Sequence, residues 1–179
     1  VSAATAVCTP CESGMYQPAS GETVCSGRAC SEGSYGPVGQ SSPGAAQCIS
    51  CVSGTYTDEV GRGGPCKGTA CSLGKYGADA QTSAATATCA ECVPGQYTPA
   101  SGLTVCQGQA CQRGKFGKSG QISSAAAACD VCLSGMYTQA TGQTTCAGIE
   151  CDAGYYGEDG QTSESSAKCK LCSRGQFQP

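Results

Sequence analysis

The sequence contains no histidine, no tryptophan and no asparagine. Without histidine, the usual base of serine and cysteine nucleophiles and the commonest metal ligand are missing. Without asparagine there is no acceptor for N-linked sugar, although the many serines and threonines leave O-linked glycan open. The acidic pairs Asp58/Glu59 and Glu158/Asp159 fall at predicted turns and do not recur at matching positions, so we expect solvated loop charges. These absences predict a protein that is not an enzyme, with no catalytic residues, no cofactor and no metal.

Large apolar residues are also scarce. Nine Val, four Leu, three Ile and two Phe make 18 of 179 residues, about half the fraction below which chains usually fail to fold. Ordering the backbone costs on the order of 1–2 kcal/mol per residue, and so little apolar surface does not offset that cost. The chain also has 18 cysteines. Cysteine at this density predicts a chain held by disulfides in place of a core, in an extracellular or cell-surface setting.

Charge excludes two classes of partner. The formal net charge is −3, charged residues make up 13%, and there is no basic run. Nucleic acid and anionic membrane surfaces are therefore not expected partners. No apolar stretch approaches the roughly 18–20 residues needed to span a bilayer, so we expect no membrane span in this segment.

One motif, Cys-x-x-Gly-x-aromatic, occurs nine times, which indicates a tandem array. Its cysteines are Cys11, Cys30, Cys51, Cys71, Cys92, Cys111, Cys132, Cys151 and Cys172. Its aromatics are Tyr16, Tyr35, Tyr56, Tyr76, Tyr97, Phe116, Tyr137, Tyr156 and Phe177. We expect the motif glycine at positive φ, or where a Cβ would collide with the adjacent disulfide. We expect the aromatic to cover that disulfide; an exposed ladder that binds carbohydrate or a neighbouring filament is the alternative.

The cysteines recur with a period of 40 or 41 residues. Residues 2–8 match residues 83–89 closely, so we expect the chain to be a slice of a longer array. The predicted segments are the end of a preceding repeat (1–10), repeat 1 (11–50), repeat 2 (51–91), repeat 3 (92–131), repeat 4 (132–171) and the start of a further repeat (172–179).

Each period divides into two halves. The A half runs from Cys11 to Cys25 and its equivalents, and we expect a hairpin of residues 14–17 and 22–25 around a turn that ends in Gly21 at positive φ. Repeat 2 has one extra residue here, in the segment 61–65. The B half runs from Cys30 to Cys48 and its equivalents, and carries Gly-x-Tyr-Gly and then Gly-Gln-x-Ser, with Ala80 replacing one glycine. We expect a second, looser hairpin there, because frequent glycine and the lack of a 3.6-residue period argue against helix.

If the halves are versions of one unit, equivalent cysteines pair in each. This symmetry favours pairing each motif cysteine with the next cysteine along, at about 3 kcal/mol per loop. The pairs are Cys11–Cys25, Cys30–Cys48, Cys51–Cys66, Cys71–Cys89, Cys92–Cys106, Cys111–Cys129, Cys132–Cys146 and Cys151–Cys169, with Cys8 and Cys172 left for missing repeats. A rival scheme joins Cys8 to Cys25 and Cys11 to Cys30. Pairing within Cys-x-x-Cys is a third.

Zinc is the main rival to disulfides, because the spacing of Cys8, Cys11, Cys25 and Cys30 suits a four-thiolate site. Against zinc, the B half repeats the aromatic motif without such a spacing. A thioredoxin-like role needs a βαβ context, and calcium-binding EGF-type sites need clustered Asp or Asn. Neither feature is present.

The pattern Cys-x-x-Gly-x-Tyr-x4-Gly-x3-Cys, as in residues 11–25 and 92–106, resembles the cysteine-rich repeats called ephrin type A/B receptor-like. It is also similar to the first loop of TNF-receptor modules and, more distantly, to EGF-like modules. The resemblance implies that the cysteine that opens such a loop pairs with the one that closes it. It does not cover the B half, where pairing depends on symmetry alone. Long arrays of such repeats occur in surface and flagellar-hair (mastigoneme) proteins of protists and algae.

The sequence thus predicts a small disulfide-rich β protein, an elongated tandem array of disulfide-stapled hairpin modules with little hydrophobic core. The predicted function is an extracellular structural repeat protein that forms a rod or filament, with self-association or other filament and surface proteins as partners. The alternatives are a receptor or adhesin ectodomain that binds protein or glycan, and zinc modules with four cysteine ligands each.

Overall fold

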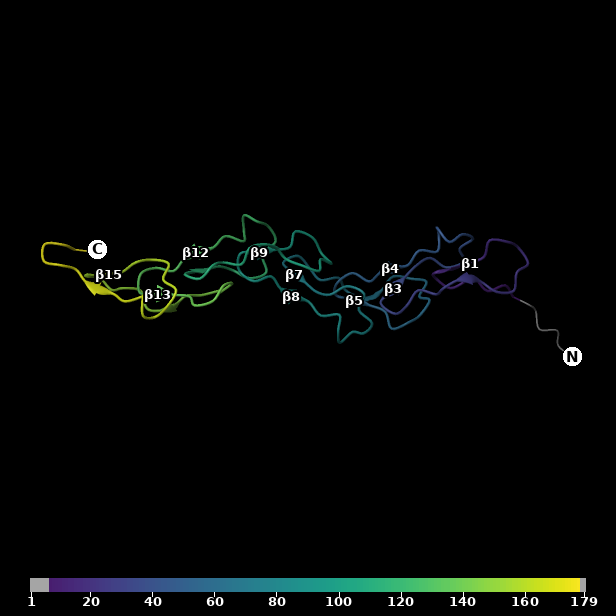
Figure 1. The fold of residues 1–179 in the computed structure, drawn as a ribbon, viewed down its shortest axis with the longest axis horizontal. Helices are drawn as coiled ribbons and strands as arrows, with labels where there is room; N and C mark the ends of the chain where they lie inside the picture. Colours follow the sequence, from purple (N-terminus) through teal and green to yellow (C-terminus); the bar gives the residue numbers. More distant parts are fainter. Residues whose placement is uncertain (1–6, 178–179) are drawn as a thin grey trace. The chain divides into compact units, whose positions relative to one another are not determined.

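A computed structural model describes residues 7–177 of the chain. The outer parts of the two predicted end segments, residues 1–6 and 178–179, lie outside the described residues. Residues 7–177 contain no helix and form sixteen strands of two residues each (Figure 1). Together with eight disulfides, these strands confirm the predicted fold of disulfide-rich tandem β-hairpin modules.

The strands follow one another in a regular order. They are β1 (Met15–Tyr16), β2 (Ser26–Gly27), β3 (Ser34–Tyr35), β4 (Ile49–Ser50), β5 (Thr55–Tyr56), β6 (Lys67–Gly68), β7 (Lys75–Tyr76), β8 (Ala90–Glu91), β9 (Gln96–Tyr97), β10 (Gln107–Gly108), β11 (Lys115–Phe116), β12 (Asp130–Val131), β13 (Met136–Tyr137), β14 (Ala147–Gly148), β15 (Tyr155–Tyr156) and β16 (Lys170–Leu171). Each odd-numbered strand pairs antiparallel with the even-numbered strand that follows it. The odd strands all contain the motif aromatic, so one hairpin forms in each half.

The second strand of each hairpin lies later in the chain than expected. In the first A half, Tyr16 lies opposite Ser26, so the pairing strand follows Cys25 and does not occupy residues 22–25. The reason is that the loop before the closing cysteine forms backbone hydrogen bonds with the preceding half and not with the first strand of its own hairpin. In later A halves, Arg62 and Gln143 accept hydrogen bonds through their backbone carbonyls from Gly36 and Gly117 of the preceding B half, at 3.2 and 3.0 Å. The predicted partner segment is therefore wrong, whereas the positive φ of the turn glycine is confirmed: 83° at Gly21.

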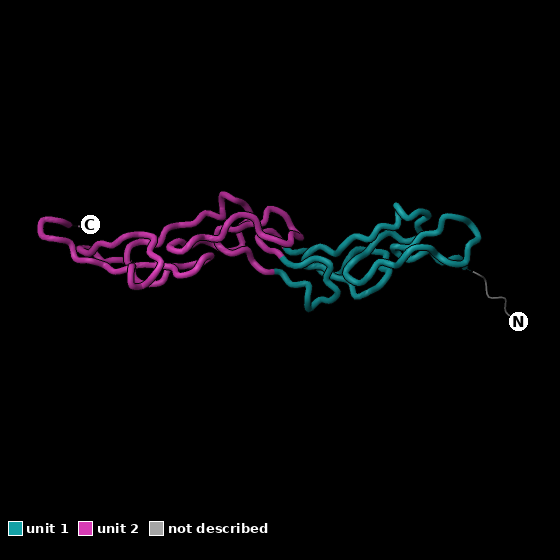
Figure 2. Tube along the Cα trace, in the orientation of Figure 1, with its two compact units in different colours: residues 1–71, 77–89 teal, residues 72–76, 90–179 magenta. Residues whose placement is uncertain are grey.

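The chain divides into two compact units (Figure 2). Unit 1 comprises Val1–Cys71 and Gly77–Cys89, and unit 2 comprises Ser72–Tyr76 and Ala90–Pro179. Within each unit, taken by itself, the hairpins follow one another in a row. The repeat boundaries drawn from the sequence remain a prediction.

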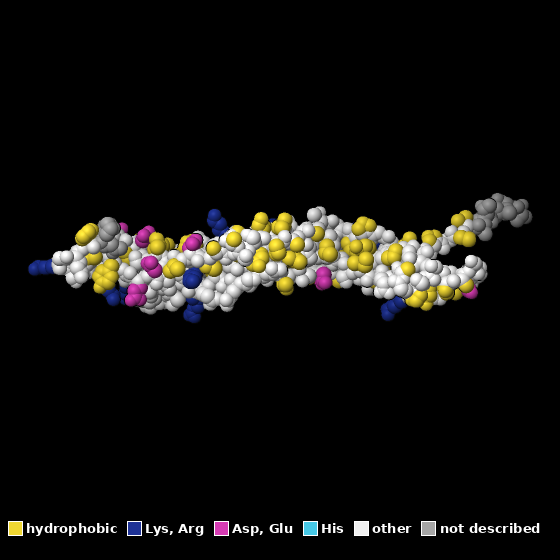
Figure 3. Space-filling model, turned by 90° about the horizontal axis from the view of Figure 1, so that it is seen from above, with side chains coloured by type: hydrophobic (Ala, Val, Ile, Leu, Met, Phe, Trp, Pro, Cys, Tyr) yellow, Lys and Arg dark blue, Asp and Glu magenta, His cyan; other side chains and the backbone are white. Residues whose placement is uncertain are grey.

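Cysteine, serine and threonine side chains make up most of the interior, together with Pro94 and Ala46. The opening cysteines from Cys11 to Cys132 are at most 6% exposed, and Thr57, Thr98 and Ser53 are completely buried. By contrast, Val24 is 73% and Ile149 83% exposed. On the face shown in Figure 3, hydrophobic side chains lie in separate clusters among polar atoms. The expectation of little hydrophobic core is confirmed.

Candidate functional site

The candidate site is not a single pocket but the set of groups that recurs in every half: a disulfide, two or three glycines and a few backbone hydrogen bonds. The structure contains eight disulfides, and they are the pairs that the half-repeat symmetry favours. They join Cys11–Cys25, Cys30–Cys48, Cys51–Cys66, Cys71–Cys89, Cys92–Cys106, Cys111–Cys129, Cys132–Cys146 and Cys151–Cys169. Cys8 and Cys172 are free thiols. The rival scheme, which joins Cys8 to Cys25, is not the arrangement in the structure.

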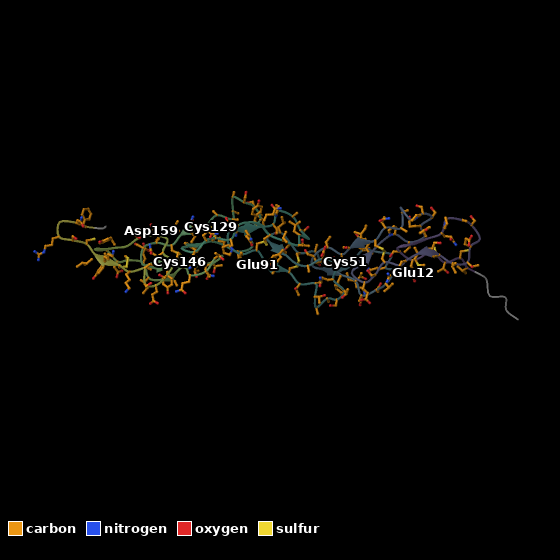
Figure 4. The ribbon with its side chains drawn as sticks, in the orientation of Figure 1. Glu12, Cys51, Glu91, Cys129, Cys146 and Asp159 are labelled. Carbon is orange, nitrogen blue, oxygen red and sulfur yellow. A yellow bond between two sulfur atoms is a disulfide. The ribbon has the colours of Figure 1, made fainter. Side chains whose placement is uncertain are left out.

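Seven of the eight disulfides join a buried cysteine to a more exposed one; in the eighth, Cys151 is partly exposed and Cys169 is exposed. Cys51 and Cys92 are completely buried, whereas their partners Cys66 and Cys106 are partly exposed, and Cys48 in the first B half is exposed. The Cα–Cα separations of 5.5–5.9 Å are ordinary for disulfides. Figure 4 labels Cys129 and Cys146, which close two consecutive halves. The opening cysteine therefore supplies the interior, and the closing cysteine ties the outer loop to it.

All nine motif glycines have positive φ, the first of the two reasons proposed for them. Their φ values lie between 78° and 89°, as at Gly54 (85°) and Gly114 (79°). A Cβ on Gly54 would lie 2.5 Å from the carbonyl oxygen of Thr69 and 2.6 Å from the amide nitrogen of Cys71. The space is thus closed by backbone, which does not move aside as a flexible side chain does. Any side chain at this position would be strained and would also separate the two strands of its own hairpin.

A different glycine lies against the disulfide. In the B halves the residue after the aromatic is glycine, and a Cβ there would lie 3.1–3.4 Å from the Sγ of the opening cysteine. At Gly117 it would also lie 3.3 Å from the Cβ of Pro94 in the preceding A half. The second glycine of Gly-x-Tyr-Gly is therefore needed for the close approach of successive halves, a role that the sequence alone did not reveal.

Successive halves are joined by one recurring backbone hydrogen bond. In six loops, a residue at positive φ, which we call the docking residue, donates its amide hydrogen to the carbonyl of the opening cysteine in the preceding half. The N···O distances are 2.7–2.8 Å in all six cases, for Gly39 to Cys11, Gly61 to Cys30, Ala80 to Cys51, Gly120 to Cys92, Gly142 to Cys111 and Gly160 to Cys132. The docking residue occurs in A and B halves alike, so the repeated structural unit is the half.

Ala80 is the exception among the docking residues. It is the one non-glycine residue with positive φ, at 50°, in residues 7–177. An L-residue with a Cβ pays roughly 1–2 kcal/mol for this conformation. Its hydrogen bond to Cys51 is nevertheless kept at 2.7 Å. Docking is therefore strong enough in this structure to hold an alanine where glycine is preferred.

The Gly-Gln-x-Ser motif of the B half holds the docking loop in shape. The Gln40, Gln81 and Gln121 side chains each donate from Nε2 to the carbonyl oxygen two residues earlier, at 2.8–2.9 Å. The serine then begins a single helical turn, as where the carbonyl of Ser123 accepts from the Ala127 amide at 3.0 Å. These side-chain bonds explain why the spacing of the B-half cysteines never varies. The recurring sequence signalled the motif but not its function.

Buried threonines mark the junction from a B half to the next A half. Thr138 Oγ1 accepts a hydrogen bond from the Gly114 amide at 2.7 Å and donates to the carbonyl of Lys115 at 3.3 Å. Thr98 Oγ1 likewise donates to the carbonyl of Lys75 at 3.2 Å. The threonines follow the motif tyrosine in repeats 2 to 4, a regularity of the sequence whose structural role depends on the fold.

The motif aromatics are only partly covered. Six of them are half-buried, whereas Tyr76, Tyr156 and Phe177 are 37, 47 and 86% exposed. In the A halves the ring lies beside a glycine of the second strand: a Cβ on Gly108 would lie 3.5 Å from two ring atoms of Tyr97. That the rings serve as a packing cover for the disulfides remains a prediction.

The acidic pairs predicted to lie in loops, Asp58/Glu59 and Glu158/Asp159, are exposed. Asp58 and Glu59 form ion pairs with basic side chains of the same loop region. Lys67 Nζ lies 2.6 Å from Asp58 Oδ1 and 2.7 Å from Glu59 Oε1, and Arg62 Nη1 lies 2.9 Å from Glu59 Oε2. The hydrogen bond from Lys67 lowers the pKa of Asp58 and, together with Arg62, that of Glu59. The same bonds raise the pKa of Lys67. The extra residue of repeat 2 therefore accompanies a small ion-pair network on one A-half loop.

Other chemistry finds little support in this arrangement. The sulfurs that a four-thiolate zinc site would use in Cys11, Cys25 and Cys30 are in disulfides, and no cluster of three or more metal-binding side chains occurs in residues 7–177. Within the same residues, no helix has the length and apolar character to cross a bilayer. A small disulfide-rich repeat fold of this kind is typical of non-enzymatic modules in an oxidising, extracellular environment.

Comparisons with known proteins give no relative. No protein-family model matches the sequence, and no curated protein is significantly similar to it. The chain is a cysteine-rich repeat array of the kind found in extracellular structural or binding modules, and no match supports the narrower resemblance to ephrin-receptor-like, TNF-receptor-like or EGF-like repeats.

Proposed function

We propose that this chain is a structural segment of an extracellular rod or filament, of the cell-surface or flagellar-hair type, and part of a longer array. One observation carries the proposal: the same docking hydrogen bond, 2.7–2.8 Å long, joins a half to the preceding one in six places. Parallel bridges such as Tyr97 to Gln121 and Phe116 to Gln143 accompany it. Because consecutive halves within each unit are bound to their neighbours in the same way, neither unit has one unique contact site. Such nearest-neighbour arrays favour extended, stiff assemblies.

The disulfides support the same proposal. Loops of 14, 15 and 18 residues are closed at regular intervals, and each closure contributes about 3 kcal/mol. An extracellular filament exposed to proteases and mechanical load benefits from cross-links that act locally. Cys8 and Cys172, which are free here, are proposed to pair with cysteines of adjoining repeats.

Small-angle scattering combined with thiol titration tests the proposal. We expect a maximum dimension of roughly 100 Å, against about 40 Å for a globule of this length. We also expect no more than two reactive thiols in denaturant, and a disulfide map that gives the eight pairs. A compact particle contradicts the rod, and sixteen or more free thiols contradict the disulfide scaffold and favour zinc.

A receptor or adhesin function is the second candidate, and the loop of repeat 2 is the observation that favours it. This A-half loop carries the ion-pair network of Asp58, Glu59, Arg62 and Lys67, and Val60 in the same loop is 61% exposed. Replacing residues 58–65 with the equivalent residues 99–105 of repeat 3 tests this function. Loss of protein or glycan capture by the whole chain, with scattering unchanged, would establish binding; unchanged capture would exclude this loop.

A further inference from the structure

The B halves of repeats 3 and 4 carry opposite net charges in equivalent segments. The segment 111–121 contains three cations and no acid, namely Arg113, Lys115 and Lys118. The segment 151–161, one period of 40 residues later in numbering, contains three acids and no cation, namely Asp152, Glu158 and Asp159. The equivalent segments of repeats 1 and 2 are nearly neutral: 30–40 contains one acid, and 71–81 one lysine and one aspartate.

The six charged side chains are exposed and form no ion pair. All six are exposed to solvent, and the four ion pairs found in residues 7–177 involve none of them. Glu158 accepts one long hydrogen bond, at 3.4 Å, from Gln161. Figure 3 shows Lys, Arg, Asp and Glu side chains projecting from the surface of unit 2, and Asp159 is labelled in Figure 4. The charges are therefore free to meet a partner.

The second strand of each of these two B-half hairpins carries one charge of the opposite sign to that of its own segment. Asp130, the one acid of repeat 3, lies on β12 opposite Phe116, and Lys170 lies on β16 opposite Tyr156. Neither forms an ion pair within residues 7–177. Repeat 3 (92–131) still has a net charge of +2, from three cations and one acid, and repeat 4 (132–171) has −3, from two cations and five acids.

We propose that the segment 111–121 of one copy binds the segment 151–161 of a second copy, so that two chains associate side by side, displaced by one repeat. This inference rests on the proposed structural function and names its partner as a second copy of the chain. Charge complementarity is the argument for that partner: a shift of one period places the segment with three cations against the segment with three acids, and Lys118 and Glu158 are the one pair at equivalent positions. Each copy keeps one segment of each sign free, so the contact is heterologous and continues from copy to copy.

The same charges argue against two other partners. A nucleic acid or sulfated glycan would meet repeat 4, with its net charge of −3, within one period of the three cations. A basic protein would meet the cations of repeat 3 in the same way. A second copy, displaced by one repeat, is matched to both segments. Because exposed ion pairs are individually weak and strongly screened, the contact should form in low salt and depend on several pairs acting together along an array.

Sedimentation velocity of the whole chain tests the contact. We expect concentration-dependent association at about 0.02 M salt and its loss at about 0.5 M, where the Debye length falls to a few ångströms. R113E/K118E, which leaves both segments acidic, should weaken association about tenfold or more, because attractive pairs become repulsive. E158K/D159K, which leaves both segments basic, should do the same. A mixture of the two variants should associate, since each then supplies the charge that the other lacks, and the quadruple variant should associate alone.

The control is R28E/R174E, which has the same net charge as R113E/K118E but alters neither segment; it should associate like the wild type. Eight intact disulfides by mass spectrometry establish that each variant is folded. The proposal is overturned by a wild type that remains monomeric at 0.02 M salt, by equal loss in the control, or by a mixture that fails to associate. Binding of a sulfated glycan by a monomeric wild type would assign the cations to that partner instead. In each of these outcomes, a scattering dimension of about 100 Å would still support the structural function, which fails only if the particle is compact.

Discussion

The A half and the B half share one scaffold but use their motif glycine differently. In an A half, a Cβ on Gly95 would meet the Gln109 carbonyl and, at 2.6 Å, the Cys111 amide, which directly follow the second strand of its hairpin. In a B half, a Cβ on Gly114 would instead meet the backbone of Gly160, the docking residue of the next B half. The same six-residue motif thus starts a hairpin in both halves, and in the B half its glycine also lies at a junction between repeats.

The loops of the two halves differ in a related way. A-half loops vary in length, with cysteine separations of 14 or 15 residues, whereas all four B-half separations are 18. The extra residue of repeat 2 follows its docking residue, Gly61, whose bond to Cys30 is kept at 2.8 Å. In the B half, the glutamine and serine side chains occupy the corresponding stretch with hydrogen bonds. Variation is therefore tolerated where only the docking bond constrains the loop.

Removing one disulfide from each kind of half should give the largest effect. C92A/C106A and C111A/C129A should each lower the local stability of repeat 3 by about 3 kcal/mol, and by nearly equal amounts, because separations of 14 and 18 residues differ by only about 0.2 kcal/mol in loop entropy. Hydrogen exchange of the β9–β12 amides measures the loss. An unequal loss, or one that spreads through the whole chain, would contradict the equivalence of the halves.

The two motif glycines should differ in where their substitution acts. G95A and G114A should each cost about 2 kcal/mol or more, because a Cβ is added at positive φ against backbone. Hydrogen exchange should show the effect of G95A within its own hairpin, and that of G114A in both repeats 3 and 4. G44A is the matched control, since a Cβ at Gly44 meets nothing within 4 Å; it should change stability by less than about 0.5 kcal/mol. Identical exchange patterns for G95A and G114A would contradict the different roles assigned to the motif glycine in the A and B halves.

Substitutions at two docking residues should have smaller effects on stability, and of opposite sign. A80G should stabilise unit 1 by about 0.5 kcal/mol, since relief of the strained φ exceeds the added chain entropy of glycine. G120A, at the equivalent position of the next B half, should destabilise by a similar amount. Denaturant midpoints measure both changes. Equal signs for the two substitutions would show that docking is not governed by backbone conformation.

The ion pairs of the repeat 2 loop should give the smallest effect. Because Lys67 lowers the pKa of Asp58 and Glu59, both carboxyls should titrate below their ordinary values of 3.8 and 4.5 in carbon-detected NMR. Their contribution to stability is present above the ordinary values and is lost as pH falls through the lowered ones. K67A should raise both pKa values, and high salt should diminish the difference, because both carboxyls are exposed and Lys67 is partly exposed. Unchanged titration in K67A would mean that the pairs do not persist in solution.

Much of this architecture follows from local sequence. The number of hairpins and the positive φ of the motif glycine are specified by residues that recur at fixed spacing, because a cross-link and a left-handed backbone conformation each demand a particular residue type. The shortage of aliphatic residues likewise predicted an interior without a hydrophobic core. These properties depend on covalent chemistry and on single-residue conformation, so they can be read without knowing the fold.

Other features were decided only by the tertiary structure. The second strand lies after Cys25 and not at residues 22–25, the docking amides bind cysteine carbonyls of the preceding half, and Thr138 is buried at a junction. In each case the partner is a backbone carbonyl or amide. Nearly every residue has a backbone amide and every residue a backbone carbonyl, so residue types alone do not identify which of these groups form hydrogen bonds with each other. The sequence determined by itself that the chain is a stapled array, and the hydrogen bonds between neighbouring halves decided how its modules are joined.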